Sequence, residues 1–176
     1  MKAVCIIPAR MKSSRFYGKP IKKILGYPMI EHVYKRVQLA KNVDEIYVAT
    51  CDREIAEVVE QFGGQVIMTS DKHVRGTDRV AEAALNIKAD IILNVQGDEP
   101  TMDPESLDRA ITIMRTQETI ECMNAVSIIT DWDVFISRDI LKAVQDIHGN
   151  IMYFSRQPVP YCEKENFDKA IKQIGV

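Results

Sequence analysis

The feature that most constrains the fold is a repeated alternation of two apolar patterns from the N-terminus to about residue 130. Four segments carry apolar side chains at positions i, i+3, i+4 and i+7, which is typical of helices buried on one side. These segments are Ile30/Val33/Tyr34/Val37, Ile55/Val58/Val59/Phe62, Val80/Ala83/Ala84/Ile87 and Leu107/Ala110/Ile111/Met114.

Short apolar runs rich in β-branched residues accompany these helical segments, and their continuity favours strands buried on both faces. The runs span residues 3–9, 45–50, 65–69, 90–95 and 123–130. Strand and helix thus alternate about four times, which predicts an α/β fold with a mostly parallel sheet and helices on both faces. We assign residues 1 to about 130 to this layered core.

The pattern changes after Asp131. Residues 141–146 and 151–155 are predicted to be two strands, and the short turn His148-Gly149-Asn150 between them favours an antiparallel hairpin. The length of 176 residues indicates one domain over residues 1–176. The hairpin region, residues 131–176, is expected to lie within that domain.

Composition excludes several classes of protein. With 23 Lys and Arg against 25 Asp and Glu, the net charge of −2 argues against binding to nucleic acid or a membrane surface. The four cysteines have no C-x-x-C spacing, so neither a zinc site nor a redox pair is indicated. Without a segment long enough for a signal peptide or a membrane span, we expect a cytoplasmic protein with reduced thiols.

The loop after the first strand is rich in cations. Residues 8–20 contain four Lys and Arg side chains, two serines, one glycine and no acidic residue. Guanidinium groups, an ammonium and hydroxyls suit an anion with several oxygens, and a polyphosphate is such an anion. The loop matches neither the P-loop nor the dinucleotide-binding motif. The alternative is a solvated basic loop with no ligand.

The loop after the fourth strand carries a candidate metal ligand. Residues 94–100 read Asn-Val-Gln-Gly-Asp-Glu-Pro and precede a helix expected to begin near Pro104. Because ligands of open α/β sheets bind outside the carboxyl ends of the strands, Asp98 should share an edge with the basic loop. A carboxylate beside a triphosphate is a natural ligand for Mg²⁺. The alternative is an aspartate that only forms a turn or cap.

A third loop, residues 71–79, links the third strand to the third helix. Thr77 or Asp78 can cap that helix. Gly76 allows the backbone to approach a ligand closely, for instance a base or ribose. His73 has no Cys or His at ligand spacing and is expected to be a loop residue rather than a metal ligand.

Five motifs occur together in an order and spacing associated with one family. They are IIPARMKSSRFYGKP, VATCD, MTSDKHVRGTDR, NVQGDEP and YFSRQPVPY. On these motifs the chain resembles the 3-deoxy-manno-octulosonate (Kdo) cytidylyltransferases, enzymes of lipopolysaccharide and capsule biosynthesis. The resemblance implies a homodimeric enzyme with a Rossmann-like nucleotidyltransferase fold, in which the hairpin region, residues 131–176, takes part in dimerisation. It would transfer CMP from Mg²⁺-bound CTP to the anomeric hydroxyl of the sugar acid and release pyrophosphate.

The same resemblance implies roles for individual residues. Arg10, Lys19 and Asp98 would be catalytic, and Asp98 would also bind Mg²⁺. Gln96 and Arg156 would face the sugar acid, with Arg156 suited to its carboxylate. The nucleotide would be bound by Pro8, Ala9, Arg10, Ser14, Arg15, Lys19, Thr69, Gly76 and Arg79.

The chain departs from the family pattern at three points. Arg75 stands where the family usually has Ser, which would alter nucleoside contacts or add a contact to phosphate. Cys51 replaces the first of two expected aspartates and leaves only Asp52. Family members continue beyond residue 176, so the chain is expected to lack a C-terminal portion with further sugar contacts and a second metal-binding aspartate.

Two alternatives to this function stay open at the level of sequence. One is the same chemistry on a related acid, either an amino-substituted Kdo or a nonulosonate. The other is a truncated, non-catalytic relative that binds a nucleotide or forms dimers.

Overall fold

The computed structural model describes residues 1–12, 16–169 and 173–175, and its account of side chains ends at Phe167. The chain forms two compact units, Met1–Glu121 and Cys122–Val176. Each unit is described by itself below.

The first unit is built on a parallel sheet with strand order β5-β4-β1-β6. Central strand β1 (Ala3–Pro8) is buried along its whole length and pairs with β4 (Glu45–Thr50) and β6 (Ile91–Asn94). Strand β5 (Gln65–Met68) pairs with the other edge of β4. The first four apolar runs predicted these strands, and the prediction for residues 45–50 matches β4 at both ends.

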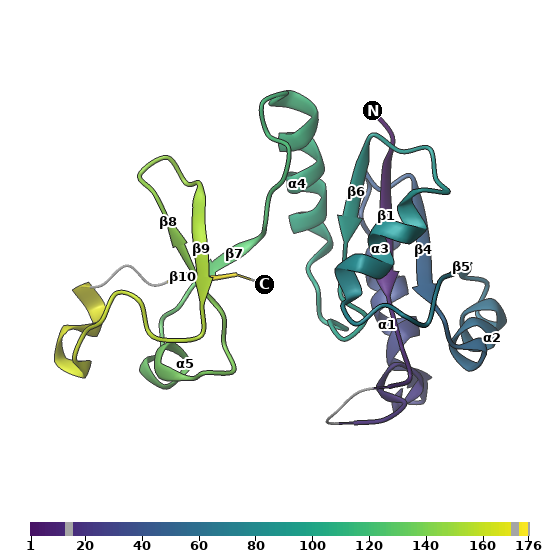
Figure 1. Ribbon diagram of the computed structural model, residues 1–176, viewed down its shortest axis with the longest axis horizontal. Coiled ribbons are helices and arrows are strands. Elements are labelled where there is room, and N and C mark those ends of the chain that lie inside the picture. Colours follow the sequence, from purple (N-terminus) through teal and green to yellow (C-terminus); the bar gives the residue numbers. More distant parts are fainter. Residues whose placement is uncertain (13–15, 170–172, 176) are drawn as a thin grey trace. The chain divides into compact units, whose positions relative to one another are not determined.

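Helices cover both faces of this sheet (Figure 1), as the sequence predicted. The alternation of side chains along β1 determines the two cores, because successive residues of a strand point to opposite faces. Cys5 and Ile7 pack into the core formed with α1 (Met29–Val37), α2 (Arg53–Gln61) and α4 (Pro104–Thr116). Val4 and Ile6 pack against α3 (Gly76–Ala84) on the other face.

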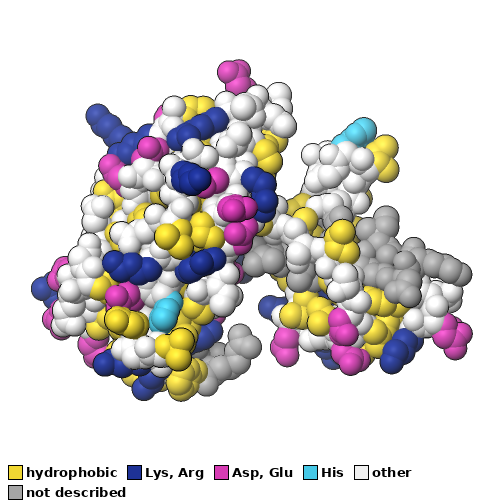
Figure 2. All heavy atoms as spheres, turned by 180° about the vertical axis from the view of Figure 1, so that it is seen from behind, with side chains coloured by type: hydrophobic (Ala, Val, Ile, Leu, Met, Phe, Trp, Pro, Cys, Tyr) yellow, Lys and Arg dark blue, Asp and Glu magenta, His cyan; other side chains and the backbone are white. Residues whose placement is uncertain are grey.

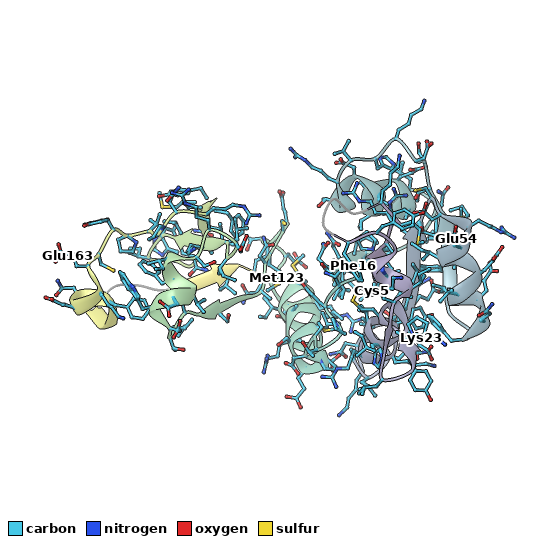
Figure 3. All side chains as sticks on the ribbon, turned by 90° about the horizontal axis from the view of Figure 1, so that it is seen from below. Cys5, Phe16, Lys23, Glu54, Met123 and Glu163 are labelled. Atoms are coloured by element: carbon cyan, nitrogen blue, oxygen red, sulfur yellow. The ribbon has the colours of Figure 1, made fainter. Side chains whose placement is uncertain are left out.

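Cys5 lies in the first of these cores (Figure 3). Its side chain is buried, and burial raises the pKa of the thiol to about 12. The thiol therefore stays protonated at neutral pH. All four cysteines are free.

The second unit contains an antiparallel sheet with strand order β7-β10-β8-β9. The predicted hairpin is present, since β8 (Lys142–Gln145) pairs with β9 (Ile151–Ser155). Its turn is fixed by the Asp146 carboxylate, which accepts the backbone N–H groups of His148 and Asn150. A small aromatic core is formed by Trp132 and Phe135 from α5 (Trp132–Ile136) and by Phe167 from a 3₁₀ helix (Lys164–Lys169).

The boundary between the two units differs from the sequence prediction. The run 123–130 was expected to belong to the parallel core, and this is wrong. Strand β7 (Val126–Ile128) pairs antiparallel with β10 (Gln173–Gly175) in the second sheet. The division accordingly falls at residue 122 and not near Asp131, because strand pairing, and not the local pattern, assigns β7 to a sheet.

Two smaller elements in the first unit were not predicted. A 3₁₀ helix (Lys19–Ile21) and the short hairpin of β2 (Lys23–Ile24) and β3 (Tyr27–Pro28) precede α1. In the described part of the chain, none of the helices combines the length and the apolar character needed to cross a membrane.

Candidate active site

A cleft of about 280 Å³ lies in the first unit where β1 and β6 end. The cleft is formed by the basic loop after β1, the loop after β6 and the start of α3. Its lining is formed by Pro8, Ala9, Arg10, Lys12, Lys19, Pro20, Met29, His73, Arg75, Gly76, Arg79, Gln96, Gly97 and Asp98. These residues include five Lys and Arg side chains against one carboxylate, so the cleft favours an anion.

The basic loop is tied to the sheet at its start and closed at its end. The Met11 N–H donates to the Asp52 carboxylate at 2.7 Å, and the Gly18 N–H donates to the Met11 carbonyl oxygen at 2.9 Å. Gly18 has a φ of +69°, a left-handed conformation that favours glycine. It leads directly into the 3₁₀ helix that begins at Lys19. Asp52 is thus an anchor of this loop, a role that the sequence did not reveal.

The decisive geometry is the pairing of Lys19 with Asp98. The Lys19 Nζ lies 2.7 Å from Asp98 Oδ2, although the two residues are 79 positions apart. A Cβ atom at Gly97 would approach the Pro8 carbonyl oxygen to 2.8 Å, so only glycine lets the loop after β6 lie this close to the end of β1. The basic loop and Asp98 therefore occupy the same rim of the sheet. This was expected because both follow the carboxyl ends of parallel strands.

Glu99, next to Asp98, has an unusual electrostatic environment. Partial burial raises the pKa of its carboxyl group, and the neighbouring charge of Asp98 raises it further. Two adjacent carboxylates at this rim repel each other. A cation at the rim would relieve that repulsion.

The third loop is held to the cleft by two side chains. Arg10 Nη1 donates to the Val74 carbonyl oxygen at 2.9 Å. On the other side of the loop, the Glu82 carboxylate of α3 accepts the Ser70 N–H and pairs with the His73 ring. These contacts order residues 70–74 from both sides. His73 is consequently a partner of a carboxylate, in line with its prediction as a loop residue.

Replacing Glu82 with Gln is expected to lower stability at neutral pH, with a deficit that shrinks in acid. The hydrogen bond from Ser70 and then the contact with His73 lower the pKa of Glu82 below its ordinary 4.5 in the folded chain. A lowered folded-state pKa gives stability that is present above 4.5 and is lost as the pH falls through the folded value. Urea midpoints of both proteins over the range from neutral pH down through the folded pKa measure this. The exposed Glu60→Gln is the control, and a gap that stays constant over this range would contradict the expectation.

Arg79 reaches the same region from α3 but is almost entirely buried, with 2% of its surface exposed. Its guanidinium donates to the Thr69 hydroxyl, to the Ser70 carbonyl oxygen at 3.2 Å and to Cys51 Sγ at 3.3 Å. It thereby joins the ends of β4 and β5 to α3. Cys51 and Thr69, singled out from the motifs, are both partners of this buried side chain.

The remaining predicted residues of the first unit lie at the end of β6 and the start of α3. Gln96 donates from Nε2 to Asn94 Oδ1 at 3.1 Å. A Cβ atom at Gly76 would lie 3.5 Å from Gln96 Oε1 and 3.3 Å from Pro8, so α3 begins directly against both strand ends. The prediction that Thr77 or Asp78 caps this helix is wrong. The helix begins at Gly76 after Arg75, and no side chain caps it.

The comparison with known proteins agrees with this geometry. A family model described as cytidylyltransferase matches residues 4–176. The chain belongs to this cytidylyltransferase family. The resemblance predicted from the five motifs is confirmed.

Two members of the family are similar to this chain over most of its length. The 3-deoxy-manno-octulosonate cytidylyltransferase of Geobacter metallireducens is 48% identical over 160 residues, which cover 91% of this chain and 63% of that protein. The protein of the same name from Thermodesulfovibrio yellowstonii is 40% identical, covering the whole of this chain and 74% of its own length. The chain thus spans about two thirds to three quarters of the length of these relatives.

A solved structure of CMP:2-keto-3-deoxy-manno-octonic acid synthetase complexed with CTP has the same fold. It matches with a TM-score of 0.92 and 38% identity, covering all of this chain and 72% of that one. A cytidylyltransferase from Leptospira borgpetersenii matches 68% of the chain with a TM-score of 0.60 at 25% identity. The predicted nucleotidyltransferase fold is thereby confirmed.

Not every predicted site residue of this chain lines the cleft. Ser14 and Arg15 fall outside the described residues. Thr69 is not part of the lining and contacts Arg79 instead. Arg156 belongs to the second unit, where its Nη1 donates to the carbonyl oxygens of Arg138 and Asp139 at 3.0 and 3.2 Å. The predicted residues that do line the cleft together are Pro8, Ala9, Arg10, Lys19, Gly76, Arg79, Gln96 and Asp98.

Proposed function

We propose that the chain transfers CMP from CTP to the anomeric hydroxyl of 3-deoxy-manno-octulosonate and releases pyrophosphate. The single observation that carries this is the 2.7 Å contact between Lys19 and Asp98, which joins a polycationic loop and a carboxylate at one cleft. The names of the relatives and the CTP complex of the similar structure support the choice of nucleotide and acceptor.

The chemistry asks the protein mainly for position and charge. The anomeric hydroxyl gives up its proton to solvent water as its oxygen forms a bond to the α-phosphorus of CTP. The bond between that phosphorus and the oxygen that bridges to the β-phosphorus breaks, so pyrophosphate leaves with the electron pair. Nucleotidyl transfer of this kind is accelerated by alignment of the two reactants and by neutralisation of phosphate charge. Arg10 and Lys19 would supply that neutralisation, and Ser14, Arg15, Pro8 and Ala9 are proposed to complete the triphosphate site.

Mg²⁺ is proposed as the cofactor, with Asp98 as its ligand. Among the described residues, no group of three or more His, Cys, Asp or Glu side chains could enclose a metal. One exposed carboxylate with a second beside it fits Mg²⁺ nevertheless, because this ion is usually held by one or two carboxylates together with substrate phosphates and water. When bound, Mg²⁺ would neutralise phosphate charge. Asp98 would then exchange its ion pair with Lys19 for the metal and leave the ammonium free for phosphate.

The nucleoside and the sugar acid are assigned to different parts of the chain. Thr69, Gly76 and Arg79 are proposed to form the nucleoside side of the site, with Arg79 acting through the Thr69 hydroxyl that it holds. Gln96, half-buried at the end of β6, is proposed to face the sugar acid. The assignment of Arg156 to the carboxylate of that acid stays a prediction.

We also propose that the chain forms a homodimer through its second unit. Strand β9 is at the edge of the sheet and exposes large apolar side chains, Met152, Tyr153 and Phe154. Hydrophobic side chains are visible on the surface of this unit in Figure 2. An exposed apolar edge strand favours pairing with another chain. Sedimentation velocity at several concentrations tests this proposal.

The function is tested by measuring pyrophosphate release with CTP, Mg²⁺ and a panel of acids. Release with Kdo above that with an amino-substituted Kdo or a nonulosonate would support the proposed acceptor. Faster release with either related acid would replace the acceptor and keep the chemistry. Binding of CTP without release for any acid would favour a non-catalytic nucleotide-binding protein.

Asp98→Asn gives the metal arm of the same experiment. Loss of one carboxylate charge is expected to lower the rate and to move its dependence on Mg²⁺ to higher concentration. Asp71→Asn is the matched control, because it makes the same chemical change at an exposed position of the third loop that does not line the cleft. An unaltered Mg²⁺ titration of Asp98→Asn would remove Asp98 from the metal site.

A further inference from the structure

Arg75 is a cation of the cleft that has no partner among the described residues. It lines the cleft and is exposed. In the part of the chain that the structure describes, its guanidinium has neither a hydrogen-bond partner nor a carboxylate partner. Three of the four other cations of the cleft are engaged. Lys19 pairs with Asp98, the Arg79 guanidinium binds Thr69, Ser70 and Cys51, and Arg10 donates to the Val74 carbonyl oxygen.

The position of Arg75 relative to Arg10 is defined by one hydrogen bond. Arg10 Nη1 donates to the carbonyl oxygen of Val74, which belongs to the peptide group that joins Val74 to Arg75. Both residues line the cleft, so this hydrogen bond brings the Arg10 side chain to the backbone from which Arg75 extends. An anion bound in the cleft would offset the repulsion between like charges in its lining.

The backbone after Arg75 adds to the positive potential at this wall. Helix α3 begins at Gly76, which lines the cleft, and no side chain caps the first N–H groups of the helix. The N-terminal end of a helix carries a partial positive charge and favours negative groups. A neutral base gains little from a guanidinium group at a helix end, whereas the phosphates next to the nucleoside that Gly76 is proposed to face are stabilised by both.

We propose that Arg75 binds the phosphate chain of the nucleotide in this cleft, next to Arg10. The inference rests on the proposed function, because it takes the ligand to be a nucleoside triphosphate, and it names a contact beyond those assigned above. A guanidinium presents paired N–H donors that match two phosphate oxygens at once. Arg75 is therefore a nucleotide-binding residue that distinguishes a triphosphate from a monophosphate.

Calorimetric titration of the chain with CTP and with CMP tests this contact. Arg75→Gln is expected to weaken CTP binding about tenfold, the loss of one charged contact, and CMP binding less than about twofold. Arg75→Lys should fall between the two proteins, because it keeps the charge and loses the paired donors. Lys72→Gln is the matched control, since it removes one charge from the same loop at an exposed position outside the cleft.

Inorganic tripolyphosphate provides a probe without a base. It should displace CTP from the unaltered chain at lower concentration than from Arg75→Gln. Equal weakening of CTP and CMP would place Arg75 at the nucleoside and overturn the inference, as would an equal effect of Lys72→Gln. CTP binding that is insensitive to Arg75→Gln overturns the inference alone, whereas absence of CTP binding to the unaltered chain overturns the proposed function as well.

Discussion

Lys19→Ala is expected to lower the rate of CMP transfer by about 100- to 1,000-fold, the usual effect of removing one group that stabilises charge in a transition state. The free energy of unfolding should change by less than about 1 kcal/mol, because ion pairs near the surface contribute little to stability. The Lys19 and Asp98 side chains are 40% and 52% exposed, so their contact is of this kind. Single-turnover pyrophosphate release and urea denaturation measure the two quantities.

Lys23→Ala is the matched control for Lys19→Ala. Lys23 is an exposed residue of β2, a few positions along the chain, and does not line the cleft (Figure 3). The control should keep both the rate and the stability of the unaltered chain. An unfolded Lys19→Ala protein would mean that the ion pair holds the loop together, and an unchanged rate would mean that Lys19 does not meet the phosphates.

The architecture of the first unit was predictable because its apolar runs are short and continuous, although burial on both faces holds for β1 and not for β5 or β6. A run such as residues 45–50, with helical patterns on either side, has few other ways to bury its side chains than a parallel sheet covered by helices. The edge shared by the basic loop and Asp98 followed from that topology, since carboxyl ends of parallel strands lie together. The contact between Lys19 and Asp98 is the outcome.

The run 123–130 shows that a local apolar pattern does not determine which strand a segment pairs with. Its apolar pattern is compatible with a parallel or an antiparallel neighbour, and the neighbour of β7 is a strand near the end of the chain, β10. Pairing between segments so far apart is decided by the packing of the whole unit. The start of α3 was missed for a local reason, because Thr77 and Asp78 are good capping residues that the structure places inside the helix.

Side-chain partners within the site were the least predictable part. Asp52 as the anchor of Met11, and Glu82 as the partner of His73, depend on the distance between a loop and an element outside it. Neither pair has a characteristic spacing. The charge of a residue was readable from the sequence, but the group that neutralises it was not.

Arg79 has two possible roles. The family motif predicts that it binds the nucleotide, whereas its burial indicates that it stabilises the fold. Arg79→Met is expected to lower the free energy of unfolding by about 2–4 kcal/mol, since hydrogen bonds from a charged donor contribute about 1.5–3 kcal/mol and their half-buried acceptors would lose this partner. Methionine is chosen because it fills much of the volume of the arginine side chain, so the loss reports on the polar contacts. Urea denaturation of the unaltered chain and the variant measures it.

Arg53→Met is the control for this prediction, because it removes an arginine from the exposed face of α2, where the side chain pairs with Glu57 at 3.5 Å. An i,i+4 pair of this type contributes about 0.2–0.5 kcal/mol, so the control should remain close to the unaltered chain. If Arg79→Met instead kept full stability and lost only CTP affinity, its guanidinium would act on the nucleotide directly. Loss of both would follow from the structure, because Arg79 holds the Thr69 hydroxyl and the end of β5 in place beside the cleft.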